Sequence, residues 1–496
     1  MNKHNKRIFK VQNKKIILIF FVQIIYIFFN GCTVTKNNSI NEQNIKIKTL
    51  DKKYELDTEV QDILSFAPDV YNKYQIDGLF ELGGLEEVVM EVVGKVLQSS
   101  HKRVGKIPTF KLINKQDLEA HVTNKNIIVV STGAVNFCFD GVSIKTGKSR
   151  LAFIIGHEMA HLANDDFRNQ ELLGQDNIEI KNFISKKHEF IADADGILNA
   201  AMAGFDPMEI VSNEDNFIEK WISQIQNTNH DYTHPDPDER IEFIKKQIKR
   251  LKKKLPFYYN AQKHFNNKNY KLALISFKVF LNEFQPAEAL NNAGLCNYKL
   301  ALQALINNED DFITKVPYYL STKYDYELKV KKFFRRVPGF MKTFIEQIKI
   351  AMERFSNAVD KDPTYIPAYI NLSSALIISQ LMDADFSEGN YEQAMGILKK
   401  ALKIKKDPKL LNNYAIAMYL SYSSSFSHGL NNDLVQQAIN TFKQAYDLNN
   451  DLPEVLFNLA YFHNLNKERE YEFYRDNFII IENTGIYYEY AINEWF

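Results

Sequence analysis

One short pattern occurs four times in the second half of this chain, and it constrains the fold more than any other feature. Each copy has an alanine, a phenylalanine or leucine four positions later, a small or aromatic residue three positions after that, and then a proline. The copies are Ala273-Phe277-Phe280-Pro286, Ala351-Phe355-Ala358-Pro363, Ala394-Leu398-Ala401-Pro408 and Ala438-Phe442-Ala445-Pro453. A second echo follows each proline: NNAG at Asn291, NLSS at Asn371, NYAI at Asn413 and NLAY at Asn458. A unit that recurs in this way buries its apolar face against its neighbours, so the pattern predicts an all-α stack of helix pairs.

The repeated region covers about residues 256–485 and resembles degenerate tetratricopeptide repeats. The resemblance implies a solenoid with a concave face that binds peptides or a protein partner. The stretch 307–342 breaks the register of the pattern. We therefore predict an insertion there, and its basic-aromatic run KKFFRR is typical of a solvated surface.

The first thirty residues differ in character from the rest of the chain. Six basic residues precede an apolar run from Ile16 to Phe29, which Gly31 and Cys32 follow. This order is typical of an export signal, and its ending resembles the bacterial lipoprotein signal, which implies that Cys32 carries lipid. We predict a signal peptide over 1–31, a flexible tether over 32–55 and a periplasmic protein with a lipid anchor in a membrane, the outer membrane being favoured. An uncleaved signal that remains as the anchor is the alternative.

Composition narrows the range of partners. The 496 residues carry a formal net charge of +0, which leaves no electrostatic argument for a nucleic-acid partner. Two cysteines remain beyond the signal, Cys138 and Cys296, and they lie too far apart in sequence to suggest a disulfide framework. We expect both to be buried thiols.

The region 56–255 mixes helix and strand signals and is predicted to be an α+β domain. Apolar periodicity indicates helices over 85–97, 149–165 and 176–203, and β-branched runs indicate strands over 108–114 and 126–132. The expected fold is therefore mainly α, with an α+β domain followed by the helical repeats.

The sequence Gly156-His157-Glu158-Met159-Ala160-His161 lies on one of these predicted helices. Residues four apart on a helix share a face, so both histidines can bind one Zn²⁺ ion. Glu158 lies beside them, where it can take a proton from water. Asp165 is eight residues from His157, about 12 Å along the axis, so the third ligand must come from another segment.

The segment KKHEFIADADG offers that ligand. Glu189 lies on a predicted helix that can pack against the first one, and Asp193 follows one turn later. A carboxylate at that position can accept the free N–H of a ligating histidine and fix its tautomer. His188 and Glu179 remain alternatives as the third ligand.

Together, these residues resemble the gluzincin metallopeptidase family that includes the CAAX prenyl proteases and HtpX-like membrane peptidases. The resemblance covers about residues 60–250 and rests on His157-Glu158-x-x-His161, Glu189-x-x-Ala192-Asp193 and the segments VVSTGAV, LAFIIGHEMAH and THPDPDERI. It implies one zinc per chain, held by His157, His161 and Glu189.

The resemblance also draws His234 and Arg240 into the site. Related envelope proteases carry a histidine near the zinc at the position of His234. In one interpretation, His234 fills the fourth zinc position and keeps the enzyme at rest. In the other, His234 and Arg240 stabilise the oxyanion.

The leading hypothesis is an exported zinc endopeptidase whose repeats deliver the substrate, and the strand at Ile127–Ser131 is expected to be an edge strand that holds it. The domain combination resembles bacterial periplasmic metalloproteases that police outer-membrane proteins, which implies unfolded or stalled envelope proteins as substrates. The alternative is an envelope chaperone or assembly scaffold with a dormant peptidase. A third hypothesis limits the enzyme to short peptides.

Overall fold

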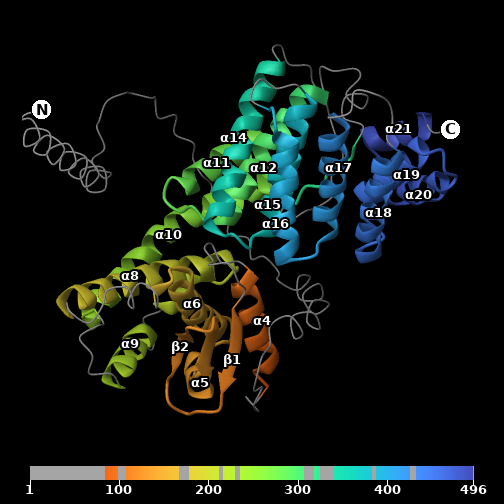
Figure 1. Ribbon diagram of the computed structural model, residues 1–496. Coiled ribbons are helices and arrows are strands. Elements are labelled where there is room, and N and C mark those ends of the chain that lie inside the picture. The colour runs from red at the N-terminus through yellow and green to blue at the C-terminus, as the bar shows by residue number, and fades with distance from the viewer. Residues whose placement is uncertain are drawn as a thin grey trace, which may run out of the picture. The chain divides into compact units, whose positions relative to one another are not determined.

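The computed structural model describes residues 84–98, 108–166, 178–211, 216–228, 235–306, 318–323, 340–382, 387–424 and 432–494. Within these ranges the chain is mainly helical and contains one small sheet, which confirms the predicted fold class (Figure 1). None of the helices in these ranges is long and apolar enough to cross a bilayer. The predicted signal, the tether, Cys32 and His234 lie outside the described residues.

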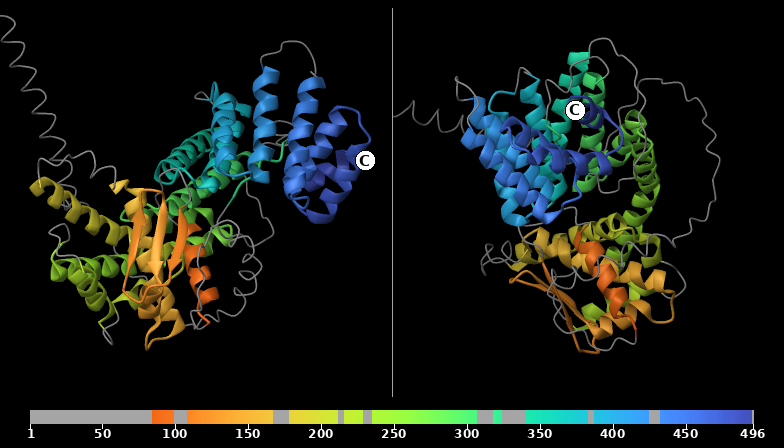
Figure 2. Two further views of the ribbon diagram at one scale, coloured as in Figure 1. Left: turned by 60° about the horizontal axis from the view of Figure 1, so that its bottom comes forward. Right: turned by 90° about the vertical axis from the view of Figure 1, so that its right-hand side faces the viewer.

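The sheet has three strands, β1 (Thr109–Ile113), β2 (Ala120–Thr123) and β3 (Ile127–Ser131), which lie side by side in Figure 2. Their order is β1-β3-β2, with β3 parallel to β1 and antiparallel to β2. The prediction that Ile127–Ser131 forms an edge strand is therefore wrong, because β3 has a hydrogen-bonded neighbour on each side. Its continuous β-branched run is typical of a central, buried strand. The edges of the described sheet are β1 and β2.

Helices from the same part of the chain complete the α+β region. Their bounds are α4 (Glu86–Gln98), α5 (Thr132–Phe139), α6 (Ile144–Ala163), α8 (Ile178–Met202), the 3₁₀ helix η1 (Pro207–Ile210), α9 (Phe217–Thr228) and α10 (Pro237–Asn266). Helix α6 is the centre of this arrangement, since it contacts the sheet, α4, α5 and α8. All five elements predicted from periodicity are present near their predicted positions, whereas β2, α5 and α9 were not predicted.

Helix α10 extends across the predicted domain boundary at 255–256. Its first turns bury Arg240 and Ile244, and its last turns bury Tyr258 and Phe265. The Tyr258 ring lies 5.9 Å from the ring of Phe277 on α11, the first helix of the repeats. One helix therefore belongs to the packed core of both predicted domains.

The repeats are consecutive helices, each of which packs against its neighbour in sequence. Their bounds are α11 (Tyr270–Leu281), α12 (Ala287–Ile306), α14 (Phe340–Lys361), α15 (Ile366–Leu381), α16 (Asn390–Ile404), α17 (Pro408–Ser424), α18 (Asn432–Leu448), α19 (Pro453–Leu465), α20 (Glu470–Ile481) and α21 (Ile486–Glu494). The four copies of the pattern lie on α11, α14, α16 and α18, and each alanine, phenylalanine and leucine in them is 0% exposed. The asparagine echoes lie on α12, α15, α17 and α19.

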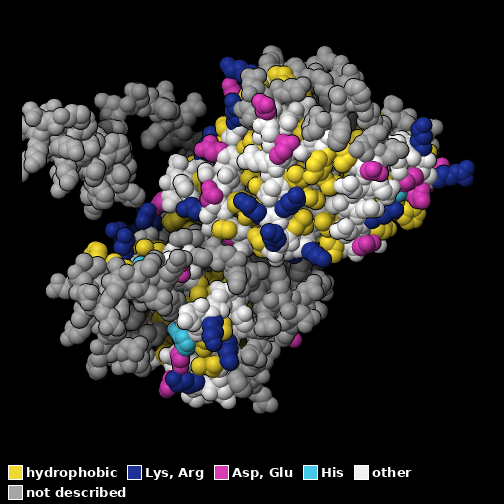
Figure 3. All heavy atoms as spheres, viewed as in Figure 1, with side chains coloured by type: hydrophobic (Ala, Val, Ile, Leu, Met, Phe, Trp, Pro, Cys, Tyr) yellow, Lys and Arg dark blue, Asp and Glu magenta, His cyan; other side chains and the backbone are white. Residues whose placement is uncertain are grey.

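Basic and acidic side chains both lie on the surface, in agreement with the formal net charge of +0 (Figure 3). Lysine side chains gather around the lower end of α16, with acidic side chains on either side of them (Figure 3).

Cys138 and Cys296 are buried and free, as expected, and burial raises the pKa of both thiols. A thiol in such surroundings stays protonated and unreactive.

Candidate metal centre

The candidate site forms where α6 and α8 cross at unusually close range. A Cβ added to Gly156 would lie 2.9 Å from the carbonyl oxygen of Gly196, and one added to Gly196 would lie 2.8 Å from the backbone nitrogen of His157. Only hydrogen fits at both positions. The Asn199 side chain donates a hydrogen bond to the Gly156 carbonyl oxygen at 3.1 Å and adds to the contact between the helices.

The crossing brings His157, His161 and Glu189 together. The two histidine Nε2 atoms lie 3.1 Å apart; that of His157 lies 3.6 Å from Oε2 of Glu189, and that of His161 lies 3.6 Å from Oε1. Ligand atoms 2.0–2.1 Å from a tetrahedral ion lie about 3.3–3.4 Å from one another. The distance between the two nitrogens is slightly below that value and the distances to the two Glu189 oxygens are slightly above it, so these residues fit a zinc ion with three protein ligands.

Asp193 and Arg240 hold His157 in position. An oxygen of Asp193, which is 0% exposed, lies 3.0 Å from Nδ1 of His157, which leaves Nε2 facing the other ligands. Arg240 donates to both Asp193 oxygens at 2.8 Å, and its Nη1 lies 3.1 Å from Glu189. Burial raises the pKa of Asp193, but Arg240 and His157 outweigh this effect and lower it below the usual value.

Asp166 has the corresponding position beside His161, and sequence reasoning missed it. Its Oδ2 atom lies 2.8 Å from Nδ1 of His161, and its other oxygen lies 3.1 Å from Nδ1 of His188. The positive φ of Asp165 (54°) turns the chain immediately after α6, which brings Asp166 back toward the helix. Each histidine of the cluster thus has a carboxylate behind it.

The cluster as a whole favours a positive charge. Four buried or half-buried carboxyl groups surround the two histidines, those of Glu158, Glu189, Asp166 and Asp193. Burial lowers the pKa of His161, but Asp166, Glu189 and Glu158 together raise it to about 9. A divalent cation supplies positive charge at the same point.

The remaining predicted site residues have varied positions. Glu158 is 8% exposed and lies on α6 between the two histidines. His188 contacts Asp166 and not the two Nε2 atoms, which is a supporting position. The side chain of Glu179 and all of His234 lie outside the described residues.

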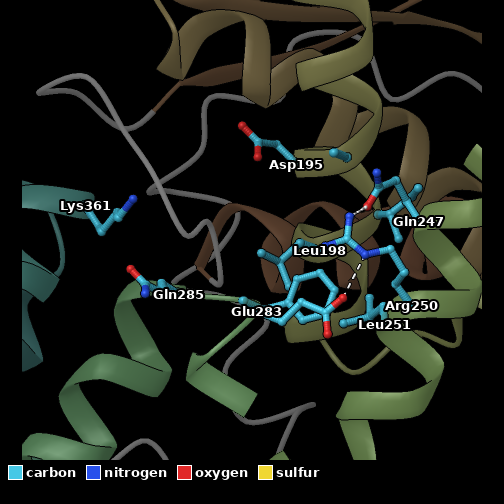
Figure 4. Close-up of a pocket in the computed structure, with 11 residues that line it drawn as sticks. Asp195, Leu198, Gln247, Arg250, Leu251, Glu283, Gln285 and Lys361 are labelled. Atoms are coloured by element: carbon cyan, nitrogen blue, oxygen red, sulfur yellow. Dashed lines mark hydrogen bonds and ion pairs between the residues drawn. The ribbon is translucent and has the colours of Figure 1, made fainter. Parts of the chain in front are cut away.

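A pocket elsewhere in the chain is not part of this centre. It lies among α8, α10 and the residues after α11, and the ion pair between Arg250 and Glu283 (2.7 Å) lies on its wall (Figure 4). No histidine or cysteine lines it. Its lining therefore offers no metal-binding chemistry of the kind found at the crossing of α6 and α8.

Comparison with known proteins finds a family likeness over part of the chain. Residues 83–177 match the model of peptidase family M48, a match that includes His157, Glu158 and His161. No curated protein matches the sequence. Residues 83–177 are thus similar to peptidase family M48, as the resemblance predicted.

Three solved structures are similar to parts of this chain. A thermophilic TPR protein from Thermus thermophilus is 19% identical, with a TM-score of 0.33 over 48% of this chain and 98% of that one. The C-terminal part of a TPR repeat-containing protein from Cytophaga hutchinsonii is 17% identical (TM-score 0.22; 45% and 78%). The human IFIT1 dimer with m7Gppp-AAAA is 14% identical (TM-score 0.24; 68% and 71%).

Proposed function

We propose that this chain is an exported zinc-dependent endopeptidase that hydrolyses unfolded or misassembled envelope proteins. The observation that supports the proposal best is the cluster of His157, His161 and Glu189, whose ligand atoms have the spacing of a tetrahedral zinc site. The match of residues 83–177 to peptidase family M48 supports the same chemistry.

In this proposal, His157 and His161 bind zinc through Nε2 and Glu189 binds it through its carboxylate. When bound, the ion would supply the Lewis acidity that polarises a scissile carbonyl and activates water. Glu158 takes the proton from the attacking water and delivers it to the leaving amine. Asp193 and Asp166 hold the two imidazole rings with Nε2 directed at the metal position.

Arg240 has a positioning role in this proposal. Its contacts with Asp193 and Glu189 fix the carboxylate behind His157 and one of the ligands at the same time. The alternative suggested by the sequence is that Arg240, together with His234, donates hydrogen bonds to an oxyanion. A substrate strand would add to an edge of the sheet, β1 or β2, because β3 is already paired on both sides.

Export and anchoring belong to the same proposal. The basic start, the apolar run and Cys32 support delivery across the inner membrane and lipid attachment. The repeats would recruit the substrate or a protein partner, and the balanced charge of the chain favours neither nucleic acid nor a strongly charged ligand.

The test separates metal binding from hydrolysis. In Glu158→Gln, casein hydrolysis should fall by about 10²–10⁴-fold, since only the general base is lost, while zinc stays near one per chain by elemental analysis. His161→Ala should lose zinc. Glu242→Gln, an exposed position on α10, is the matched control and should behave as the parent protein does. Full hydrolysis by Glu158→Gln would overturn the assignment.

A further inference from the structure

A short segment of the predicted insertion lies extended against the repeat helices. Residues 318–323 contact α15, α17 and α19, and they form the short green trace beside α17 in Figure 1. Tyr318, Leu320 and Ser321 are 7%, 8% and 1% exposed. Half of the segment is therefore buried against the helices, and Tyr319, Thr322 and Lys323 are half-buried.

Three asparagines hold the backbone of this segment. Each one accepts the N–H of a segment residue through Oδ1 and donates through Nδ2 to the carbonyl of the same residue. The pairs are Tyr319 with Asn458 (2.9 and 2.9 Å), Ser321 with Asn413 (2.8 and 3.1 Å) and Lys323 with Asn371 (2.8 and 2.8 Å). We call this set the asparagine ladder.

The ladder accounts for three of the four asparagines that recur after the prolines of the repeat pattern, and the fourth, Asn291, accepts a hydrogen bond from Asn371. Asn371, Asn413 and Asn458 are each 0% exposed, and each begins one of the echoes found in the sequence. Alternate residues of an extended chain lie about 6.6–6.8 Å apart and present their N–H and C=O groups to the same side. One repeat therefore advances by two residues of the bound segment, which runs from the last repeat toward the earlier ones.

Recognition through the ladder is independent of the side chains of the bound segment. Each asparagine reproduces the paired hydrogen bonds that a neighbouring strand makes in an antiparallel sheet. Every residue except proline carries the required N–H and C=O. Any polypeptide that adopts an extended conformation can satisfy the ladder, and a folded protein, whose backbone groups are already paired, cannot.

Neighbouring side chains add a preference. The Tyr318 ring lies 5.6 Å from Tyr461 and 5.9 Å from Phe462, and the Tyr319 ring stacks on Tyr487 at 4.5 Å. These contacts favour aromatic residues at this end of the bound segment.

The surroundings of Ser321 favour a small polar residue and not an aromatic one. Its hydroxyl group donates to Glu454 at 2.9 Å in a space that leaves the side chain 1% exposed. The ladder and its surroundings thus fit a segment with aromatic residues followed, two positions later, by a small polar one.

We propose that the asparagine ladder is a binding site for extended segments of unfolded polypeptides, and that residues 318–323 occupy it in cis and exchange with them. Helices α12 and α14, which flank the insertion, pack directly against each other, so their pairing does not depend on the segment. This inference deepens the proposed function. Peptide binding by the ladder does not require the proposed peptidase activity; only the delivery of bound segments to the metal centre rests on that proposed function.

The test measures peptide binding in the Glu158→Gln background, in which the probe peptide is not hydrolysed. The probe is a fluorescein-labelled peptide of residues 315–326, followed by anisotropy with the full chain. Ser321→Pro removes the N–H that Asn413 accepts and should release the cis segment. A tethered segment competes at an effective concentration in the millimolar range, so its release should tighten peptide binding by about tenfold or more.

Two variants control this result. Thr322→Pro lies in the same segment, but its N–H points away from the ladder by the alternation of an extended chain, and it should bind peptide as the parent does. Adding Asn413→Ala to Ser321→Pro should abolish the gain in affinity. An unchanged affinity in Ser321→Pro, or a gain that survives Asn413→Ala, would overturn the proposal and leave the segment as a structural filler.

A second measurement applies if Ser321→Pro fails to fold. In the parent chain, saturating peptide should accelerate hydrogen–deuterium exchange of the amides of residues 318–323, and unchanged exchange would overturn the proposal. Failure of the peptide to bind while casein is still cleaved would reject only the ladder as a binding site. Binding without cleavage by the parent chain would reject only the proposed peptidase.

Discussion

The metal centre and the asparagine ladder are both built from buried polar side chains on helices, but they are stabilised in different ways. The metal centre collects charged and titratable groups at one crossing of two helices, and each histidine there depends on one carboxylate. The ladder distributes neutral amides over three repeats, and each amide pairs with the backbone of one residue of the segment. A single substitution should therefore have a severe effect at the metal centre and a graded one at the ladder.

The largest effect is expected at Arg240. Arg240→Ala leaves Asp193 buried without its cationic partner, and breaking a buried pair in this way costs about 3–5 kcal/mol. Arg250→Ala on the same helix is the matched control, because the Arg250 side chain is 47% exposed and its pair with Glu283 contributes about 0–1 kcal/mol. Denaturant unfolding of both variants gives the comparison. Equal losses in the two would show that the cluster is not held together by its buried charges.

A smaller effect, on zinc affinity, is expected when the carboxylates beside the two histidines are removed. Asp193→Ala and Asp166→Ala should each weaken zinc binding by about 10–100-fold, because the imidazole they orient is then free to rotate. Competition with a zinc-binding dye measures the affinity. Asp195→Ala, on α8 outside the cluster, is the control and should bind zinc normally. If Asp166→Ala binds as tightly as the parent, Asp166 has no role in orienting His161.

The sequence predicted the elements that follow from periodicity and the residues that lie close together in a motif. Helix α6, helix α8 and the repeats were predicted because each has its own apolar pattern. The grouping of His157, His161 and Glu189 could also be predicted from the sequence, because each of the two helices has its own face that bears residue types able to bind zinc. These three are brought together in the structure, and their assignment as zinc ligands remains a proposal.

The features that escaped prediction depend on contacts between distant segments. Asp166 could not be predicted as a partner of His161, because its approach depends on a turn at Asp165 that no periodicity shows. The central position of β3 depends on the short strand β2, whose four residues carry little signal. The ladder depends on segment 318–323, and its residue Tyr319 is 139 positions from Asn458. The asparagines recur visibly in the sequence, but nothing in the residues around them identifies segment 318–323 as their partner.

The smallest effects are expected at two glycines, and they should have opposite signs. Gly196→Ala places a methyl group 2.8 Å from a backbone atom of α6, so the helices must separate at a cost of about 1–3 kcal/mol. Gly396→Ala, on α16, meets no atom within 4 Å and should stabilise its helix by about 0.5–1 kcal/mol, because alanine loses less backbone entropy than glycine. Thermal unfolding gives the sign in each case. Because the crossing at Gly196 also sets the distance between Glu189 and the two histidines, the first variant should lose zinc affinity as well, whereas the second should retain both zinc and peptide binding. A Gly196→Ala variant with normal zinc affinity would show that the metal centre tolerates a shift of α8, and the contrast between a rigid centre and a tolerant ladder would then fail.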